Sequence, residues 1–237
     1  MVEPPEATEQ LPEPKDQKLD LGLVIWPDKF LRHPVAPFPE ENLGTRLVKN
    51  TAGAMIKTMY KYQGVGLAAQ QVGVPFQIFV MDSGWHNEGS KKHPRVFLNP
   101  RVTEIGDGAV ELKRPGEGCL SFPYDYRQPV ARVDKLELEW LDFKGESHHE
   151  WFEGYDAIII QHELDHLAGY CFIDRLSPLK RDMALRRARK MRRRYENGYK
   201  KMLKSMKNAP RTKEYQLKRG AAFDAGVRAG KELATCE

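Results

Sequence analysis

The segment His162-Glu163-Leu164-Asp165-His166 constrains this chain more than any other feature of its sequence. It directly follows Ala157–Ile160, which is apolar on every side, so the helix predicted over Phe152–Leu167 is expected to be central to the fold. Residues four apart lie on one face of a helix, so both imidazoles can reach a single cation. Glu163 can then take a proton from water at that cation. Because burying these polar groups without a purpose is costly, the segment predicts a metal site.

Two histidines leave such a site incomplete, because a catalytic metal needs a third protein ligand and an open position for water. Zinc proteases with the pattern HExxHxxGxxH have a third histidine where this chain has Phe172, and Glu196 lies in a basic segment without supporting context. Cys171 is flanked by apolar residues and is predicted to be a core residue. Cys119 follows a glycine in a Pro/Gly-rich loop, and a thiolate beside a cation is a strong ligand. We therefore favour Cys119 as the third metal ligand, rather than as a purely structural residue.

The rest of the pattern predicts further helices and several β-strands along the chain. A helix is expected from helical spacing before the glycines at 64 and 66, and Gly169 is expected to end the central helix. Ser177-Pro178 opens a long basic helix that runs to about residue 206. The helix before those glycines is predicted over Leu47–Tyr60, and strands are predicted over Phe76–Met81, Val96–Val102 and Val133–Leu141.

The length of 237 residues suits one core with appendages. We expect a disordered acidic lead-in over 1–20, a catalytic domain over 21–178, the basic helix over 179–207, and an extension of unassigned structure over 208–237. No apolar stretch reaches the roughly 18 residues of a membrane-spanning helix. With only 3 cysteines, a disulfide scaffold is excluded and a reducing compartment is expected, either the cytoplasm or an organelle after removal of a transit peptide.

Charge is distributed unevenly along the chain. Residues 1–179 contain 19 Lys/Arg and 27 Asp/Glu, whereas residues 180–237 contain 19 Lys/Arg and only 6 Asp/Glu. A basic segment of this kind attracts polyanions, although a plain solvated helix face is the alternative. The run Arg186–Arg194 has no aromatic residues between its charges, which argues against reading of RNA sequence and favours attraction to phosphate alone.

Three segments together resemble the signature motifs of peptide deformylases: Gly64-Val65-Gly66-Leu67-Ala68-Ala69-Gln70-Gln71, Glu117-Gly118-Cys119-Leu120-Ser121 and Gln161-His162-Glu163-Leu164-Asp165-His166-Leu167-Ala168-Gly169. They occur in the family's order, and the resemblance covers roughly residues 21–194. It implies an α+β fold in which antiparallel strands surround a central helix that carries both histidines. It also implies a hydrolase that removes the formyl group from N-formylmethionine at the start of nascent polypeptides and releases formate. One divalent metal is implied, Fe(II) in the cell, with zinc, nickel or cobalt able to replace it.

The resemblance further assigns roles to individual residues. A hydroxide on the metal attacks the formyl carbon, and Glu163 acts as general base and then as general acid toward the leaving amine. Two donors stabilise the charge on the formyl oxygen, namely the side-chain amide of Gln71 and the backbone N–H of Leu120. Gln71 could also be a surface amide. The implied metal ligands are Cys119, His162 and His166.

Substrate contacts follow from the same resemblance. The main chains of Val65, Gly66 and Gly118 pair with the substrate like an added strand. The methionine side chain lies in a pocket that includes Tyr155, Ile158, Ile159 and the ring of His162, although the two isoleucines could be plain core. Arg127 contacts the substrate and Arg132 pairs with Glu117, or both are surface charges.

Deformylases are thought to dock on the ribosome through a C-terminal helix, and residues 180–207 suit such a role. We expect no membrane partner and a monomer. Two alternatives stay open: a zinc endopeptidase with the same His-Glu-x-x-His helix, and a non-catalytic ribosome-binding protein with a vestigial site. Assays on formylated and unformylated peptides distinguish the endopeptidase from a deformylase. The phenotype of Glu163→Ala distinguishes the non-catalytic protein from an enzyme.

Overall fold

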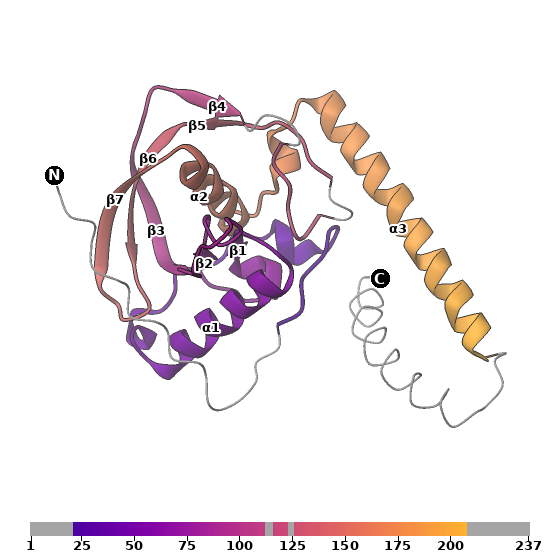
Figure 1. Cartoon of the computed structure of the whole chain (residues 1–237), viewed down its shortest axis with the longest axis horizontal. Helices are drawn as coiled ribbons and strands as arrows, with labels where there is room; N and C mark the ends of the chain where they lie inside the picture. Colours follow the sequence, from indigo (N-terminus) through magenta and orange to yellow (C-terminus); the bar gives the residue numbers. More distant parts are fainter. Residues whose placement is uncertain (1–20, 112–115, 123–125, 208–237) are drawn as a thin grey trace.

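The structure is a computed structural model that describes residues 21–111, 116–122 and 126–207 (Figure 1). The lead-in predicted over 1–20 and the extension over 208–237 lie outside the described residues. The helices are α1 (Arg46–Lys61), α2 (Gly154–Leu167) and α3 (Pro178–Lys207), with short 3-10 turns at Lys29–Arg32, Glu40–Asn42, Ala69–Val72 and Phe172–Arg175. The strands are β1 (Gly66–Ala68), β2 (Ile78–Met81), β3 (Arg95–Ile105), β4 (Ala109–Glu111), β5 (Ala131–Val133), β6 (Lys135–Leu141) and β7 (Ser147–Glu153).

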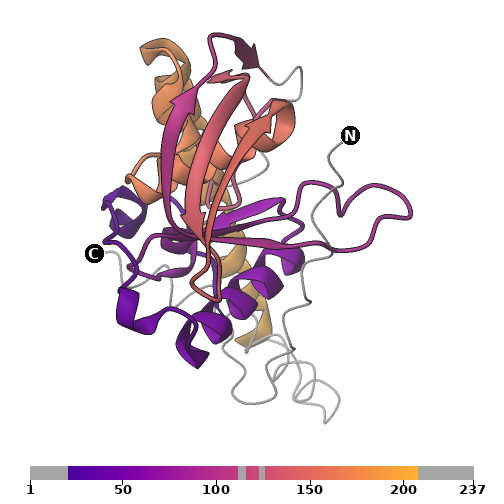
Figure 2. The same ribbon diagram turned by 90° about the vertical axis from the view of Figure 1, so that its left-hand side faces the viewer.

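Five strands form one antiparallel sheet in the order β1-β2-β3-β6-β7, while β4 and β5 form a separate ribbon. Along β6, Leu136, Leu138 and Trp140 are buried and alternate with half-buried residues, as expected for a strand with one face on the core. Helix α2 contacts β1, β2, β5, β6 and β7, and Figures 1 and 2 show it enclosed by the curved sheet. The predicted α+β fold with antiparallel strands is confirmed.

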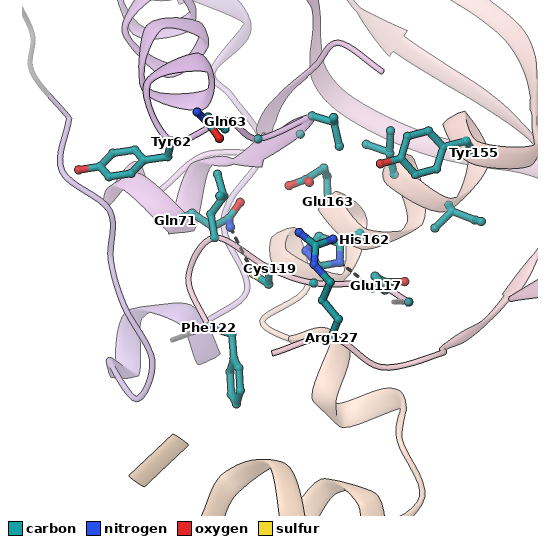
Figure 3. A pocket seen from close by; sticks show the side chains of 18 of the residues that line it. Tyr62, Gln63, Gln71, Glu117, Cys119, Phe122, Arg127, Tyr155, His162 and Glu163 are labelled. Atoms are coloured by element: carbon teal, nitrogen blue, oxygen red, sulfur yellow. Dashed lines mark hydrogen bonds and ion pairs between the residues drawn. The ribbon is translucent and has the colours of Figure 1, made fainter. Parts of the chain in front are cut away.

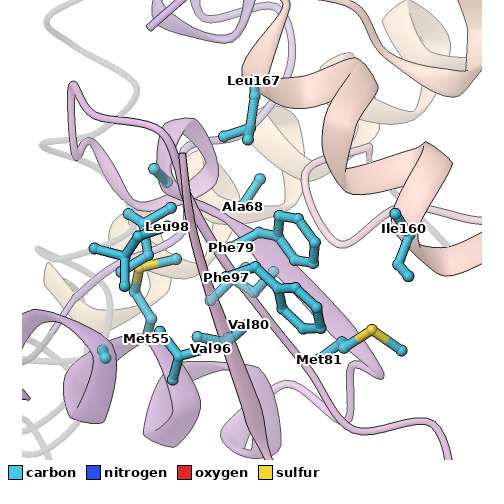
Figure 4. Packing of buried hydrophobic residues seen from close by; sticks show 14 of the residues in the cluster. Met55, Ala68, Phe79, Val80, Met81, Val96, Phe97, Leu98, Ile160 and Leu167 are labelled. Atoms are coloured by element: carbon cyan, nitrogen blue, oxygen red, sulfur yellow. The ribbon is translucent and has the colours of Figure 1, made fainter. Parts of the chain in front are cut away.

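The main core lies between the sheet and helices α1 and α2 (Figure 4). Phe79 of β2 and Phe97 of β3 stack with ring centroids 4.4 Å apart, and both side chains are fully buried. Met55 of α1 reaches the same cluster, as do Ile160 and Leu167 of α2. Burying the apolar side of α2 in this way fixes the opposite side of the helix toward the cleft described below.

A Schellman motif ends α2, as the glycine at 169 predicts. The N–H of Tyr170 donates to the carbonyl of Asp165, and the N–H of Gly169 donates to that of His166. Gly169 has a φ of +81°, in the left-handed region that favours glycine. The helix therefore ends at Leu167, directly after its second histidine.

A second buried cluster joins α3 to the body. Ala184 and Ala188 of α3 pack with Cys171 and Phe172, and the ring of Phe172 is fully buried. Cys171 is therefore a core residue, as predicted. Beyond this contact α3 extends away from the body (Figure 1). Among the described residues, no helix combines the length and the apolar composition that crossing a membrane requires.

Two predicted boundaries were wrong. The stretch Val133–Leu141 is not one strand: it divides into β5 and β6, because Asp134 breaks the regular pairing and its carbonyl accepts from the N–H of Gly154 instead. Phe152 belongs to β7 and not to α2. Strand β7 lies at the edge of the sheet, and Phe152 is its one fully buried side chain, so its sequence lacks the apolar alternation that predicts a strand.

Candidate metal centre and cleft

Cys119, His162 and His166 come together although they lie on two distant segments. Their ligand atoms all fall within 4.8 Å of one another, and the Cys119 sulfur lies 3.1 Å from Nε2 of His166. Both histidines are buried on α2, one turn apart, with ring centroids 5.0 Å apart. Cys119 reaches them from the loop that precedes β5. A thiolate with two imidazoles is a set that suits several late divalent metals, so these residues fit one cation.

Glu117 orients the first histidine. Its Oε1 lies 2.6 Å from Nδ1 of His162, which leaves the other ring nitrogen for a cation. Burial alone raises the pKa of Glu117, but hydrogen bonds and positive charge from His162 and Arg132 outweigh it and lower this pKa to about 2. Burial lowers the pKa of His162, yet its contacts with Cys119 and Glu117 raise it well above the usual value. The surroundings of this ring thus favour positive charge, which agrees with a cation site.

Arg132 connects the loop that carries Cys119 to helix α2 beneath the site. Its guanidinium donates to both carboxylate oxygens of Glu117, at 2.7 and 3.0 Å, and to Asp165 at 2.7 Å. The predicted pairing of Arg132 with Glu117 is therefore present. Asp165, inside the histidine motif, also accepts two hydrogen bonds from Arg175. No motif in the sequence indicates the roles of Asp165 and Arg175, because these roles depend on contacts that form only in the fold.

Glu163 is buried beside the ligand cluster, and one of its oxygens, Oε2, has no hydrogen-bond partner among the residues that the structure describes. Burial is the main cause that raises its pKa, to about 7. The main chain of β1 packs closely against it: a Cβ added to Gly66 would lie 2.3 Å from Oε1 of Glu163. Glycine is required at 66 for this close approach. A buried carboxyl group that titrates near neutrality is suited to proton transfer.

Gln71 has a fixed orientation in the cleft. Its Oε1 accepts from the N–H of Ala68 at 2.8 Å, so its amide nitrogen points toward Cys119, 3.5 Å from the sulfur (Figure 3). The side chain is 1% exposed, which excludes the alternative of a surface amide. Leu120, the other predicted donor, directly follows Cys119 and its side chain faces Gly64 across the cleft.

A cavity of about 610 Å³ connects these groups (Figure 3). Every site residue predicted from the sequence lines it except His166, which is fully buried beneath. Tyr155, Ile158 and Ile159 form one part of its wall, and Tyr62 and Gln63 lie on the opposite side of Glu163. The predicted members of the lining are Val65, Gly66, Gln71, Gly118, Cys119, Leu120, Arg127, Tyr155, Ile158, Ile159, His162 and Glu163.

Several lining residues were not predicted, among them Tyr62, His86 and Phe122. His86 lies between β2 and β3, in a polar stretch that carries no recognisable motif. By contrast, β1 is the edge strand of the sheet, so one side of its main chain is open toward the cleft. An extended peptide can pair there, as the main-chain roles predicted for Val65 and Gly66 require.

Comparison with known proteins shows which proteins this chain is similar to. The family model of polypeptide deformylases matches residues 21–182. A peptide deformylase of Zymomonas mobilis is 44% identical over 183 residues, which cover 76% of this chain and 98% of the relative. The crystal structure of a peptide deformylase from Legionella pneumophila superposes with a TM-score of 0.64 at 36% identity, covering 74% of this chain and 97% of that one. A peptide deformylase of Acinetobacter baumannii with bound Met-Ala-Ser has a TM-score of 0.61 at 29% identity, over 68% and 100% of the two chains.

Proposed function

Because this chain belongs to the peptide deformylase family, enzymes that hydrolyse a formyl group, we propose that its cleft removes the formyl group from N-formylmethionine at the start of nascent polypeptides. One observation carries the proposal. The ligand atoms of Cys119, His162 and His166 lie within 4.8 Å of one another, next to the unpartnered carboxylate oxygen of Glu163. This places cation ligands and a proton acceptor in a cleft of suitable size for a peptide.

The three ligands would hold one divalent cation, and we propose Fe(II), with zinc, nickel or cobalt as replacements. When bound, such a cation supplies Lewis acidity that lowers the pKa of water and polarises a carbonyl. Burial and the charge of His162 lower the pKa of His166, which keeps its ring neutral, the form that binds metals. The hydrogen bond that Nδ1 of His162 donates to Glu117 holds the ring of His162 in place.

Glu163 moves the proton in the proposed reaction. Its free oxygen Oε2 accepts a proton from the attacking water, and the same carboxyl group then gives that proton to the leaving amine. A pKa of about 7 permits both directions of transfer near neutral pH. Formate and a peptide with a free amino terminus are the products.

Gln71 and Leu120 stabilise the charge that develops on the formyl oxygen. The hydrogen bond from Ala68 holds the Gln71 amide with its N–H groups toward the site before any substrate arrives. A donor that is already oriented costs no reorganisation during the reaction, and the loss of one such donor typically costs roughly 3 kcal/mol. The backbone N–H of Leu120 is proposed as the second donor, on the opposite wall.

The substrate enters as an added strand along the edge of β1. Its main chain pairs with Val65 and Gly66 on one side and with Gly118 on the other. Its methionine side chain lies against Ile158 and Ile159, with Tyr155 at the rim, where this ring is 45% exposed. The proposed contact of Arg127 with the substrate is supported by its place in the lining.

Formate release from formyl-Met-Ala-Ser tests this function, with unformylated Met-Ala-Ser and an internal peptide as controls. We expect formate from the formylated peptide only, and loss of this activity on anaerobic chelation followed by recovery on adding back Fe(II). Cleavage of the internal peptide would favour the endopeptidase, an alternative that Phe172 already weakens because its ring is buried in packing. A protein that holds the metal and releases no formate would support the vestigial site.

We also propose that α3 docks on ribosomal RNA through its positive charge. Between residues 180 and 207 there are 13 Lys/Arg and only 2 Asp/Glu, and the described cations from Arg193 onward are exposed. Packing of Ala184 and Ala188 fixes the start of the helix on the body, so its far part is presented as a rigid arm. Sedimentation with ribosomes at increasing salt tests this, and binding that does not change with salt would contradict it.

A further inference from the structure

The main chain of residues 63–65, which lines the cleft, is held by a loop that has no role in the proposed reaction. This loop, residues 82–94, connects β2 to β3 and contacts the main-chain carbonyls of Gln63, Gly64 and Val65, which all line the cleft. The backbone N–H of Asp82 donates to Val65 at 2.8 Å, and the indole Nε1 of Trp85 donates to Gly64 at 2.8 Å. The ring of His86 lies 3.3 Å from the carbonyl of Gln63.

The loop is itself anchored to the end of α1. The hydroxyl of Tyr60 donates to Oδ2 of Asp82 at 2.6 Å, and the N–H of His93 donates to the same oxygen at 2.8 Å. The ring of Trp85 meets the ring of Tyr60 edge to face at 5.1 Å. Lys92 lies over the ring of Tyr60 at 4.3 Å. The indole is thus fixed in place before it contacts Gly64.

The segment that the loop holds touches both sides of the proposed reaction centre. An added Cβ at Gly66 would meet the carboxylate of Glu163, and one at Gly64 would lie 2.7 Å from the side chain of Leu120. Two glycines in three residues give this segment more backbone freedom than an ordinary strand has. Without outside contacts it would sample conformations in which its edge cannot pair with a peptide.

We infer that Trp85 is a positioning residue that holds residues 63–66 in the conformation that pairs with substrate. This inference rests on the proposed function. Trp85 does not line the cleft, so it acts through Gly64 and not by contact with the peptide. If only part of the molecules have the pairing conformation, apparent affinity falls by that fraction, while bound substrate selects the competent form. The expected signature is a raised KM with a nearly unchanged kcat.

The test is Trp85→Phe, which keeps an aromatic ring and removes the indole N–H. For formyl-Met-Ala-Ser we expect KM to rise about 5- to 30-fold, with kcat within about twofold, because a buried carbonyl loses its partner. The inhibition constant of Met-Ala-Ser should rise by the same factor. Trp151→Phe on β7 is the matched control, because its ring lies over Lys135 and outside the cleft lining, and we expect no change in KM.

Each other outcome has a definite meaning. An unchanged KM and inhibition constant in Trp85→Phe overturn the inference, and so does a lowered kcat at constant KM, which would indicate a loss of folded protein only. If the unsubstituted protein releases no formate, the proposed function fails, and calorimetric titration with Met-Ala-Ser still decides the role of Trp85. If Trp85→Phe does not fold, Tyr60→Phe replaces it: KM should rise about 2- to 5-fold through the loosened Asp82, and no rise overturns the inference.

Discussion

The charged side chains around α2 and those along α3 lie in opposite environments: the first are buried and paired, and most of the second are exposed. Around α2, Glu117, Arg132 and Asp165 have side chains no more than 7% exposed, and each charge has an oppositely charged partner at 2.7 Å. Along α3, cations outnumber acids and most described side chains face solvent. Buried charges need partners because losing water is costly, and their interactions are strong and little screened. Exposed charges cost little, act at longer range, and depend on salt. The first arrangement builds a rigid site, and the second leaves positive charge exposed to solvent, as the proposed docking on ribosomal RNA requires.

The largest effect on activity is expected from a substitution in the buried region around α2. Glu163→Gln keeps the shape of the side chain and removes its proton acceptor, so kcat for formate release should fall roughly 10²- to 10⁴-fold. Metal analysis should show unchanged metal content. Because burial raises the pKa of Glu163 to about 7, its charge costs stability as pH rises from about 4.5 through 7. The metal-free variant should therefore be more stable to urea than the metal-free parent at pH 8. A variant with the parent's kcat would remove Glu163 from the reaction.

The next effect concerns the ion pairs beneath the site. The pKa of Glu117 is depressed to about 2, so its charge stabilises the fold above the unfolded value of 4.5, and this stabilisation is lost as pH falls from about 4.5 to about 2. Glu117→Gln should lower the free energy of unfolding at pH 7 by roughly 3 kcal/mol. The difference from the parent should shrink across that acidic window in urea titrations. An equal difference at pH 7 and at pH 2 would contradict the assigned pKa.

A smaller effect is expected on α3. Replacing Arg193 and Lys200 by alanine should weaken ribosome binding roughly 10- to 100-fold near 0.1 M salt and make the logarithm of affinity less dependent on salt. Formate release from a short peptide should not change. Arg101→Ala combined with Lys135→Ala is the matched control, because these exposed cations are paired with Glu139 and Glu153 on the sheet. Equal loss of binding in both variants would mean that net charge alone, and not α3, attracts the ribosome.

The smallest effect should come from an exposed ion pair of the sheet. Arg95 and Glu150 lie 2.6 Å apart, with 33% and 47% of their side chains exposed. Solvent screens such a pair, so Glu150→Gln should change the free energy of unfolding by less than about 1 kcal/mol. Urea unfolding at pH 7 beside Glu117→Gln gives the direct comparison. A loss as large as that of Glu117→Gln would show that burial does not explain the difference between the two regions.

Much of the fold was predictable wherever the pattern is local. Helix α1 differs from its predicted span by one residue at each end, and α2 ends where Gly169 predicts. Strand β7 was missed because only Phe152 faces the core, and the division between β5 and β6 was missed because Asp134 interrupts pairing within an otherwise regular alternation. In both cases the missing information is which neighbour the strand pairs with, and local sequence does not contain it.

The sequence by itself determined that His162 and His166 share a helix face with Glu163 between them, because helical spacing fixes those positions over a single turn. Only the tertiary structure decided which cysteine meets them. Cys119 lies 47 residues before His166 yet within 3.1 Å of its ring, whereas Cys171, much closer in sequence, turns into the second core. The same holds for the contact of Arg132 with Asp165, 33 residues away in the chain, and for that of Trp85 with Gly64, 21 residues away. A helix sets neighbours through its own backbone hydrogen bonds, but contacts between segments depend on how the whole core packs.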